Sequence, residues 1–186
     1  MYNLIKHYFR SANSISYMAV NKSVNLRSFK RKLSHHRSAF RKFLNKTEKN
    51  PPRGIDQRTP EVEQEVWKEV DCLSCANCCK KMTPTFTQQD IKRISKHFNQ
   101  TPEEFRRQWL VRDRNKDLVN KKQPCQFLNL ADNKCSIYAI RPVDCSGFPH
   151  LSKRKWSEYA HVHKQNIDYC PATFKMVEKM MSLYEA

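Results

Sequence analysis

Four cysteines within eight residues limit what this chain can fold into more than any other feature of its sequence. They are Cys72, Cys75, Cys78 and Cys79, and four more follow at Cys125, Cys135, Cys145 and Cys170. A hydrophobic core uses single cysteines as small apolar side chains, but it needs no such cluster. Thiolates with two residues between them can bind one soft ion, and four thiolates form a tetrahedral zinc site or hold an iron-sulfur cluster. We therefore expect these cysteines to form a thiolate site for Zn²⁺, for iron or for an iron-sulfur cluster.

The spacing leaves open how the eight thiols divide between sites. On a continuous helix, steps of about 100° place Cys72, Cys75 and Cys79 on one side and turn Cys78 away. Alternatively, the first three cysteines follow the spacing of bacterial ferredoxins, and the Cys-Pro pair at Cys170 completes the set. Both schemes leave four thiols for a second site or for a structural role.

Disulfides are the main alternative for an even number of cysteines in a compact body. The N-terminal residues lack the unbroken apolar core of a secretory signal, and the cysteines cluster more tightly than a disulfide scaffold requires. We therefore expect a reduced, cytoplasmic protein. No segment approaches the roughly 20 consecutive apolar residues of a membrane-spanning helix, so we expect no membrane span.

Positive charge and cysteine occupy different parts of the chain. The formal net charge is +17, and the first acidic residue is Glu48. Residues 1–47 contain eleven Lys and Arg, whereas no cysteine precedes Cys72. We predict a basic N-terminal arm and linker over residues 1–58 and a cysteine-cluster metal-binding domain over residues 59–186.

The arm contains a predicted amphipathic helix over residues 25–46. Its apolar residues recur at helical spacing among basic ones: Leu26, Phe29, Leu33, Phe40, Phe43 and Leu44. This apolar side could contact nucleic acid, an anionic membrane or the protein's own domain, and we favour packing on the domain. Residues 1–20 contain no acid and loosely resemble an organelle targeting peptide; a translation start at Met18 or a disordered tail are the alternatives.

Several helix starts are marked in the remaining sequence. Thr59 followed by Pro60 predicts the start of a helix that runs into the first cysteines. Thr87 and Thr101 each have an acidic residue three positions later, which is typical of a capping box. A last helix is predicted to begin at Pro171.

Apolar segments 126–130 and 134–138 flank a turn-forming sequence at residues 131–133, which favours a small β-hairpin. The predicted fold class is therefore α+β: short helices around a small hairpin, stitched together by metal, with a basic helical N-terminal arm. Because metal binding ties distant segments together, it would stabilise a body with a modest apolar core.

Other side chains near the cysteines are candidates for supporting roles. His150, His161 and His163 could each replace a cysteine on an ion, but we expect them on the basic surface. Tyr138 is expected in the core. Arg141 could donate to a thiolate, or it could anchor an Arg-Pro turn with its guanidinium in solvent.

The order of these motifs resembles the YkgJ-type cysteine-cluster family, described as a zinc- or iron-chelating domain. The resemblance covers about residues 70–175. It is carried by the C-x-x-C-x-x-C-C segment, Cys125-Gln-Phe-Leu, the segment from Cys135 through Ile137-Tyr138 and Arg141-Pro142 to Cys145, Phe148-Pro149 and Cys170-Pro171. The resemblance implies a small, mostly cytoplasmic bacterial protein whose eight cysteines bind metal. Two positions depart from the family pattern: Ala76 replaces a common glycine, and Ser146 replaces a usual arginine.

Structural metal binding through thiolates is the function that these features favour. The chain has neither Gly-x-Ser-x-Gly nor His-Glu-x-x-His, so any redox or methyl-transfer-associated enzyme role depends on an iron-sulfur cluster. A further alternative is a basic nucleic-acid-binding protein with structural zinc, since Phe29, Phe40 and Phe43 lie among basic residues. The mildly basic cysteine-bearing body does not favour this alternative, and no motif identifies a protein partner.

Overall fold

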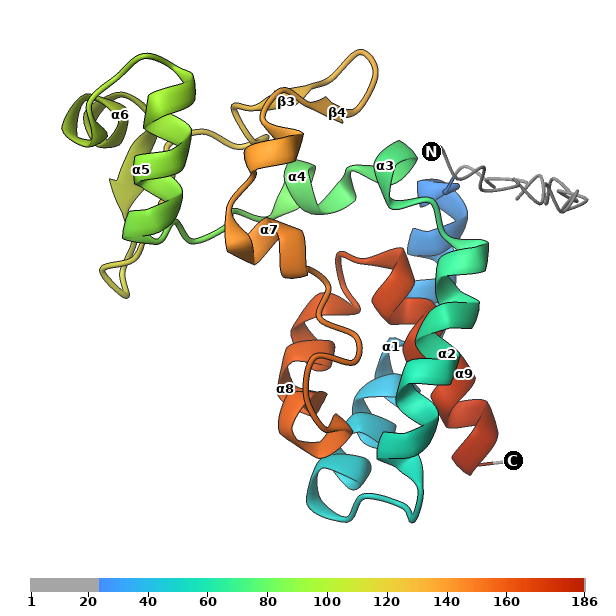
Figure 1. Cartoon of the computed structure of the whole chain (residues 1–186). Coiled ribbons are helices and arrows are strands. Elements are labelled where there is room, and N and C mark those ends of the chain that lie inside the picture. Colours follow the sequence, from blue (N-terminus) through green and yellow to red (C-terminus); the bar gives the residue numbers. More distant parts are fainter. Residues whose placement is uncertain (1–23, 186) are drawn as a thin grey trace, which may run out of the picture.

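The computed structural model describes residues 24–185, which form two bodies joined by short helices (Figure 1). One body is a bundle of four helices, and the other combines two helices with two small hairpins. Each body has its own cluster of buried apolar side chains. Because the segments between the bodies carry several of the cysteines, this division positions the candidate site.

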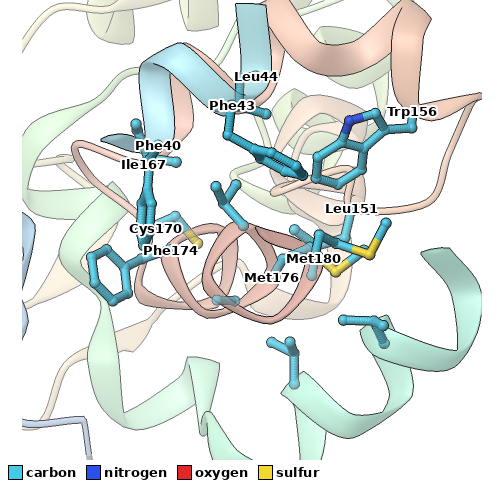
Figure 2. Close-up of a cluster of buried hydrophobic side chains, with 14 of the residues drawn as sticks. Phe40, Phe43, Leu44, Leu151, Trp156, Ile167, Cys170, Phe174, Met176 and Met180 are labelled. Atoms are coloured by element: carbon cyan, nitrogen blue, oxygen red, sulfur yellow. The ribbon is translucent and has the colours of Figure 1, made fainter. Parts of the chain in front are cut away.

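The bundle is built from both ends of the described chain. It contains α1 (Leu26–Lys49), α2 (Ile55–Glu69), α8 (Trp156–Asn166) and α9 (Pro171–Tyr184). Helix α1 packs along α8 and α9, and α2 packs on α9. Aromatic and aliphatic side chains from these helices fill the core, as Figure 2 shows for Phe43, Trp156 and Met180. The Trp156 indole N–H donates to Thr47 Oγ1 at 2.8 Å, so its one polar atom is satisfied in the core.

Helix α1 confirms the expected packing of the amphipathic arm. Asn25 caps the helix by accepting a 2.9 Å hydrogen bond from the Ser28 N–H. Phe29, Phe40 and Phe43 are all buried in the bundle core. The targeting segment and the Met18 start considered above lie outside the described residues.

Helix α2 begins five residues earlier than the Thr59-Pro60 signal predicts. Its N-cap, Gly54, has a φ of 81°, in the left-handed region that glycine adopts without strain. Pro60 therefore lies inside the helix, and Thr59 Oγ1 donates to the Ile55 carbonyl at 2.8 Å instead of capping. Ile55 is buried in the bundle core, and this apolar burial offsets the hydrogen bond lost at Pro60.

The second body begins with two capped helices. They are α5 (Gln88–His97) and α6 (Pro102–Trp109). The Asp90 N–H donates to Thr87 Oγ1 at 3.1 Å, and the Glu104 N–H donates to Thr101 Oγ1 at 3.2 Å. Both acids accept a hydrogen bond in return from the capping threonine's backbone, so both predicted capping boxes are confirmed.

Two short antiparallel hairpins complete the second body. Strands β1 (Leu110–Arg112) and β2 (Leu118–Asn120) form one, and β3 (Leu128–Asn129) and β4 (Lys134–Cys135) form the other, followed by the 3-10 turn η1 (Tyr138–Ile140). The predicted hairpin is confirmed as β3 and β4, although its strands are shorter than expected. The first hairpin escaped prediction because its three-residue strands flank a charged turn with no clear alternation.

Three short helices lie between the two bodies (Figure 1): α3 (Cys72–Cys75), α4 (Asn77–Lys81) and α7 (Val143–Gly147). Asn77 Nδ2 donates to the Tyr169 carbonyl at 2.6 Å and so ties α4 to the bundle. The Thr85 N–H donates to Asp144 Oδ2 at 3.0 Å, which holds α7 to the segment leading into the second body. These contacts fix the cysteine-bearing segments to both bodies.

At the level of fold class, the α+β prediction is confirmed: helices dominate, and the strands form small hairpins. Within residues 24–185, no helix is both long enough and apolar enough to cross a membrane.

Candidate metal centre

The C-x-x-C-x-x-C-C segment does not form one continuous helix. Helices α3 and α4 meet at Ala76, whose φ of 47° lies in the left-handed region. Asp71 caps α3 by accepting a 2.9 Å hydrogen bond from the Leu73 N–H. The glycine common at the Ala76 position in the resembled family suits this conformation, because glycine has no Cβ to clash. The break at Ala76 removes the geometry on which the continuous-helix division of the thiols depended.

Four cysteines from distant parts of the chain line one small cavity of about 20 Å³. They are Cys72, Cys75, Cys78 and Cys170, which we call the bundle group. Cys170 is the N-cap of α9 and lies in the bundle core (Figure 2). Apolar and aromatic side chains, among them Trp67 and Phe148, form other walls. This grouping matches the second of the two divisions that the spacing leaves open.

The other four cysteines gather on the side of the second body. They are Cys79, Cys125, Cys135 and Cys145, which we call the hairpin group. The Cys125 N–H donates to the Cys79 carbonyl at 2.8 Å, and Cys135 pairs with Leu128 in the β3 and β4 hairpin. The Leu128 N–H in turn donates to the Cys125 carbonyl at 3.0 Å. Cys145 comes from α7, between the bodies.

Within the bundle group, the thiols resist ionisation. Although Cys72 is exposed as a residue, desolvation by nearby protein atoms together with the charges of Cys170 and Cys75 raises the pKa of Cys72 to about 11. Burial also raises the pKa of Cys75 and of Cys170. A bound cation would favour the thiolates, because it neutralises charges that otherwise repel one another at close range.

Three thiols of the hairpin group, those of Cys125, Cys135 and Cys145, resist ionisation in the same way. Burial raises the pKa of Cys145, and the charges of Cys79, Cys125 and Cys135 raise it further. Burial likewise raises the pKa of Cys125 and of Cys135. The charge of Cys79 raises the pKa of each of the other three thiols, so the four side chains form one electrostatic cluster.

Cys78 and Cys79 join the two groups, because these neighbours in α4 belong to different ones. Their sulfur atoms are 3.9 Å apart. The hydrogen bond between them lowers the pKa of Cys79 to about 7, and the same hydrogen bond, with burial, raises the pKa of Cys78. The pair therefore releases one proton readily and resists releasing the second.

The chemistry of the donor set suits a soft metal ion, since all eight cysteines are free thiols and thiolates are the ligands of zinc and of iron-sulfur clusters. In the arrangement that the structure gives residues 24–185, no three His, Cys, Asp or Glu side chains are positioned to hold a metal ion. The thiols of each group are thus neighbours that would have to turn toward a common point to bind an ion.

The prediction that His163 lies on the protein surface is wrong. This side chain is 0% exposed, and its ring centroid lies 5.0 Å from that of Trp156 in the bundle core. The repeat of Trp156, Ala160, His163 and Ile167 along α8 could have indicated its inward position. His163 is not among the residues that line the cysteine cavity.

The prediction that Tyr138 lies in the core is wrong, because its side chain is 45% exposed. Its ring supports the Arg141 guanidinium, whose central carbon lies 3.9 Å from the ring centroid. Arg141 Nη1 also donates to the Tyr138 carbonyl at 2.7 Å, so Arg141 anchors the turn after η1. Its charge favours the Cys135 thiolate, although burial has the larger effect on the pKa of Cys135 and raises it.

Comparison with protein-family models finds one that matches residues 71–171, more than half of the chain. Its description is "CxxCxxCC: Putative zinc- or iron-chelating domain". The chain belongs to this family. The matched range begins at Asp71, the cap of α3, and ends at Pro171, so it contains all eight cysteines. The suspected family is therefore confirmed. No curated protein and no solved structure matches the chain.

Proposed function

We propose that this protein binds zinc or iron at two thiolate sites, one for each cysteine group. The observation that carries the proposal is the cavity at which Cys72, Cys75 and Cys78 meet Cys170 from the far end of the matched domain. A cavity of about 20 Å³ has room for a single small ion or one water molecule. The hairpin group supplies the second set of four thiols.

The structural reason for such sites lies in the two separate cores. The bundle core and the core of the second body share no buried residue. In the proposed arrangement, Cys170 holds α3 and α4 to the bundle, while Cys125 and Cys135 hold α4 and α7 to the second body. Because Cys78 and Cys79 are neighbours in α4, binding at both sites would fix the two bodies relative to each other.

Thiolate-only donor sets are typical of structural zinc and of iron-sulfur clusters, and they disfavour magnesium or calcium. A zinc ion would have a structural role, whereas an iron-sulfur cluster would supply electron-transfer chemistry. The second case is the alternative function, a redox or methyl-transfer-associated module. Free thiols persist in reducing compartments, which supports a cytoplasmic location as part of the proposal.

Anaerobic purification followed by metal analysis and absorption spectroscopy tests the proposal. We expect bound zinc in a colourless protein, or bound iron with broad absorption near about 400 nm if a cluster is present. Addition of metal to the reduced apoprotein should release protons, because the raised pKa values of Cys72 and Cys145 hold these thiols protonated.

Single substitutions assign the sites. Cys170→Ser and Cys145→Ser should each lose metal at one site and retain it at the other. Val177→Ala is a matched control, because it removes buried atoms from α9 without removing a thiol, and it should keep the full metal content. Purified protein without metal, or both serine variants with undiminished metal, would contradict the proposal.

A further inference from the structure

Helix α1 carries far more positive charge than the fold uses. Nine of its residues are Lys or Arg, and Glu48 is its one acid. Helical phase separates these basic residues into sets with different surroundings. The difference between the sets indicates what the outer face of α1 can bind.

Three basic residues of α1 form ion pairs with the rest of the bundle. Arg37 Nη2 lies 2.6 Å from Asp168 Oδ2, and Arg41 Nη2 lies 3.1 Å from the same oxygen. Near the end of the helix, Lys46 Nζ lies 3.1 Å from Glu185 Oε1. These side chains hold α1 to the segment after α8 and to the end of the chain.

A second set, which we call the outer stripe, consists of Arg27, Arg31, Lys42 and Lys49. All four are exposed, and none has an ion-pair partner among residues 24–185. With steps of about 100° per residue, the four positions fall within about 60° of one another on the helix. Their sequence span corresponds to about 33 Å along the axis, at about 1.5 Å per residue. The outer stripe is therefore a row of exposed cations held along one side of a single helix.

We infer that the outer stripe of α1 binds the phosphate backbone of double-stranded nucleic acid without regard to base sequence. A duplex presents regularly spaced phosphates along a stiff axis, so a rigid row of cations can contact several of them at once. Such contacts release counterions and give binding that weakens steeply with salt. This inference does not depend on metal binding.

The burial of the apolar side of α1 argues against a membrane as the occupant. A helix that lies on a bilayer inserts its apolar face between the lipids. In α1 that face is occupied, because Phe29, Phe40, Phe43 and Leu44 are buried in the bundle core. The amphipathic sequence allowed two partners besides the protein's own domain, a membrane and nucleic acid. The structure argues against the membrane.

The same burial favours a duplex over a single strand. Proteins that bind single strands without sequence preference stack bases on aromatic side chains. The sequence places Phe29, Phe40 and Phe43 among basic residues, but the structure turns all three rings into the core. Backbone contacts alone remain, and these suit a duplex whose bases are already stacked.

Binding of the full-length, metal-loaded protein to DNA and RNA duplexes of about 20 base pairs tests the inference, with the matching single strands and anionic vesicles as the other probes. The variant replaces Arg27, Arg31, Lys42 and Lys49 with Gln. If each residue contacts one phosphate, the slope of log K against log salt should become shallower by about 3.6, and affinity for duplex at about 100 mM salt should fall more than about tenfold.

The matched control removes four exposed cations from the second body by Gln substitution at Lys92, Lys96, Arg114 and Lys122. Both variants lower the net charge equally, so the control should lose less than about threefold in affinity. Equal losses would overturn the inference, since they would mean attraction by net charge alone. Stripe-dependent binding that is as tight for single strands or for vesicles would also overturn it. A duplex preference lost only in the stripe variant supports it.

Discussion

Mild acid should destabilise the helical bundle through one buried histidine. Neither ring nitrogen of His163 has a hydrogen-bond partner in the part of the chain that the structure describes, and the side chain is 0% exposed. Burial, and to a smaller extent the charges of His161 and His150, lower the pKa of His163 to about 4. The unfolded chain, in which this histidine has an ordinary pKa of about 6.5, therefore binds a proton at a pH at which His163 of the folded chain is still neutral.

The sign and size of the effect follow from this difference in pKa. Between the two pKa values the unfolded state holds more protons, so stability rises with pH and falls on acidification. A gap of about 2.5 pKa units corresponds to about 3 kcal/mol once pH lies below both values. Between about pH 7 and about pH 5, the loss attributable to His163 should be about 2 kcal/mol.

The perturbation is His163→Leu, which has a similar volume and cannot be protonated. Urea unfolding of wild type and variant at about pH 7, 6 and 5 gives the free energy of unfolding of each. Since thiol protonation and metal loss affect both proteins alike, the difference between them isolates the histidine. At neutral pH, His163→Leu should be as stable as wild type or more so, because it removes a buried N–H without a partner.

The control is His35→Gln, an exposed histidine on α1 of the same bundle, which should keep the acid sensitivity of wild type. Parallel pH dependence of wild type and His163→Leu would refute the reasoning. It would mean that the folded protein admits a proton at His163 and that the burial argument fails.

Further predictions concern single residues and the metal. Asp90→Asn should lower the free energy of unfolding by about 1 to 3 kcal/mol, because the buried carboxylate accepts the Val143 N–H and the Arg93 guanidinium. Burial opposes ionisation of Asp90, but these hydrogen bonds and those from its capping threonine lower its pKa, so its contribution should disappear only as pH falls through that lowered value. Leu44→Ala should cost about 2 to 5 kcal/mol in chemical denaturation, since Leu44 is fully buried. Ala76→Gly should raise the melting temperature through a gain of about 0.5 to 1 kcal/mol, because glycine relieves the left-handed backbone. Removal of metal by a chelator should split thermal unfolding into separate transitions of the two bodies, and one unchanged transition would contradict the proposed link through α4.

Local chemistry explains the predictions that agree with the structure. Thr87 and Thr101 begin helices because each pairs with an acid three residues later, and such a pattern depends on neighbours alone. Two predictions were wrong at positions where burial against distant residues decided the outcome. Ile55 draws the start of α2 ahead of Thr59, and His163 lies inside the bundle because α8 turns it toward Trp156.

The sequence by itself determined which atoms could bind metal and which family the chain resembles, because residue identity and spacing are properties of the chain. Only the tertiary structure decided how Cys78 and Cys79 separate into different groups and that Cys170 joins the first. It also decided that the aromatic face of α1 is buried and that the four cations of its outer stripe have no ion-pair partner within residues 24–185. The physical reason is the same for the cysteines and for α1. The neighbours of a side chain depend on which surfaces pack together, and those surfaces come from segments far apart in the sequence.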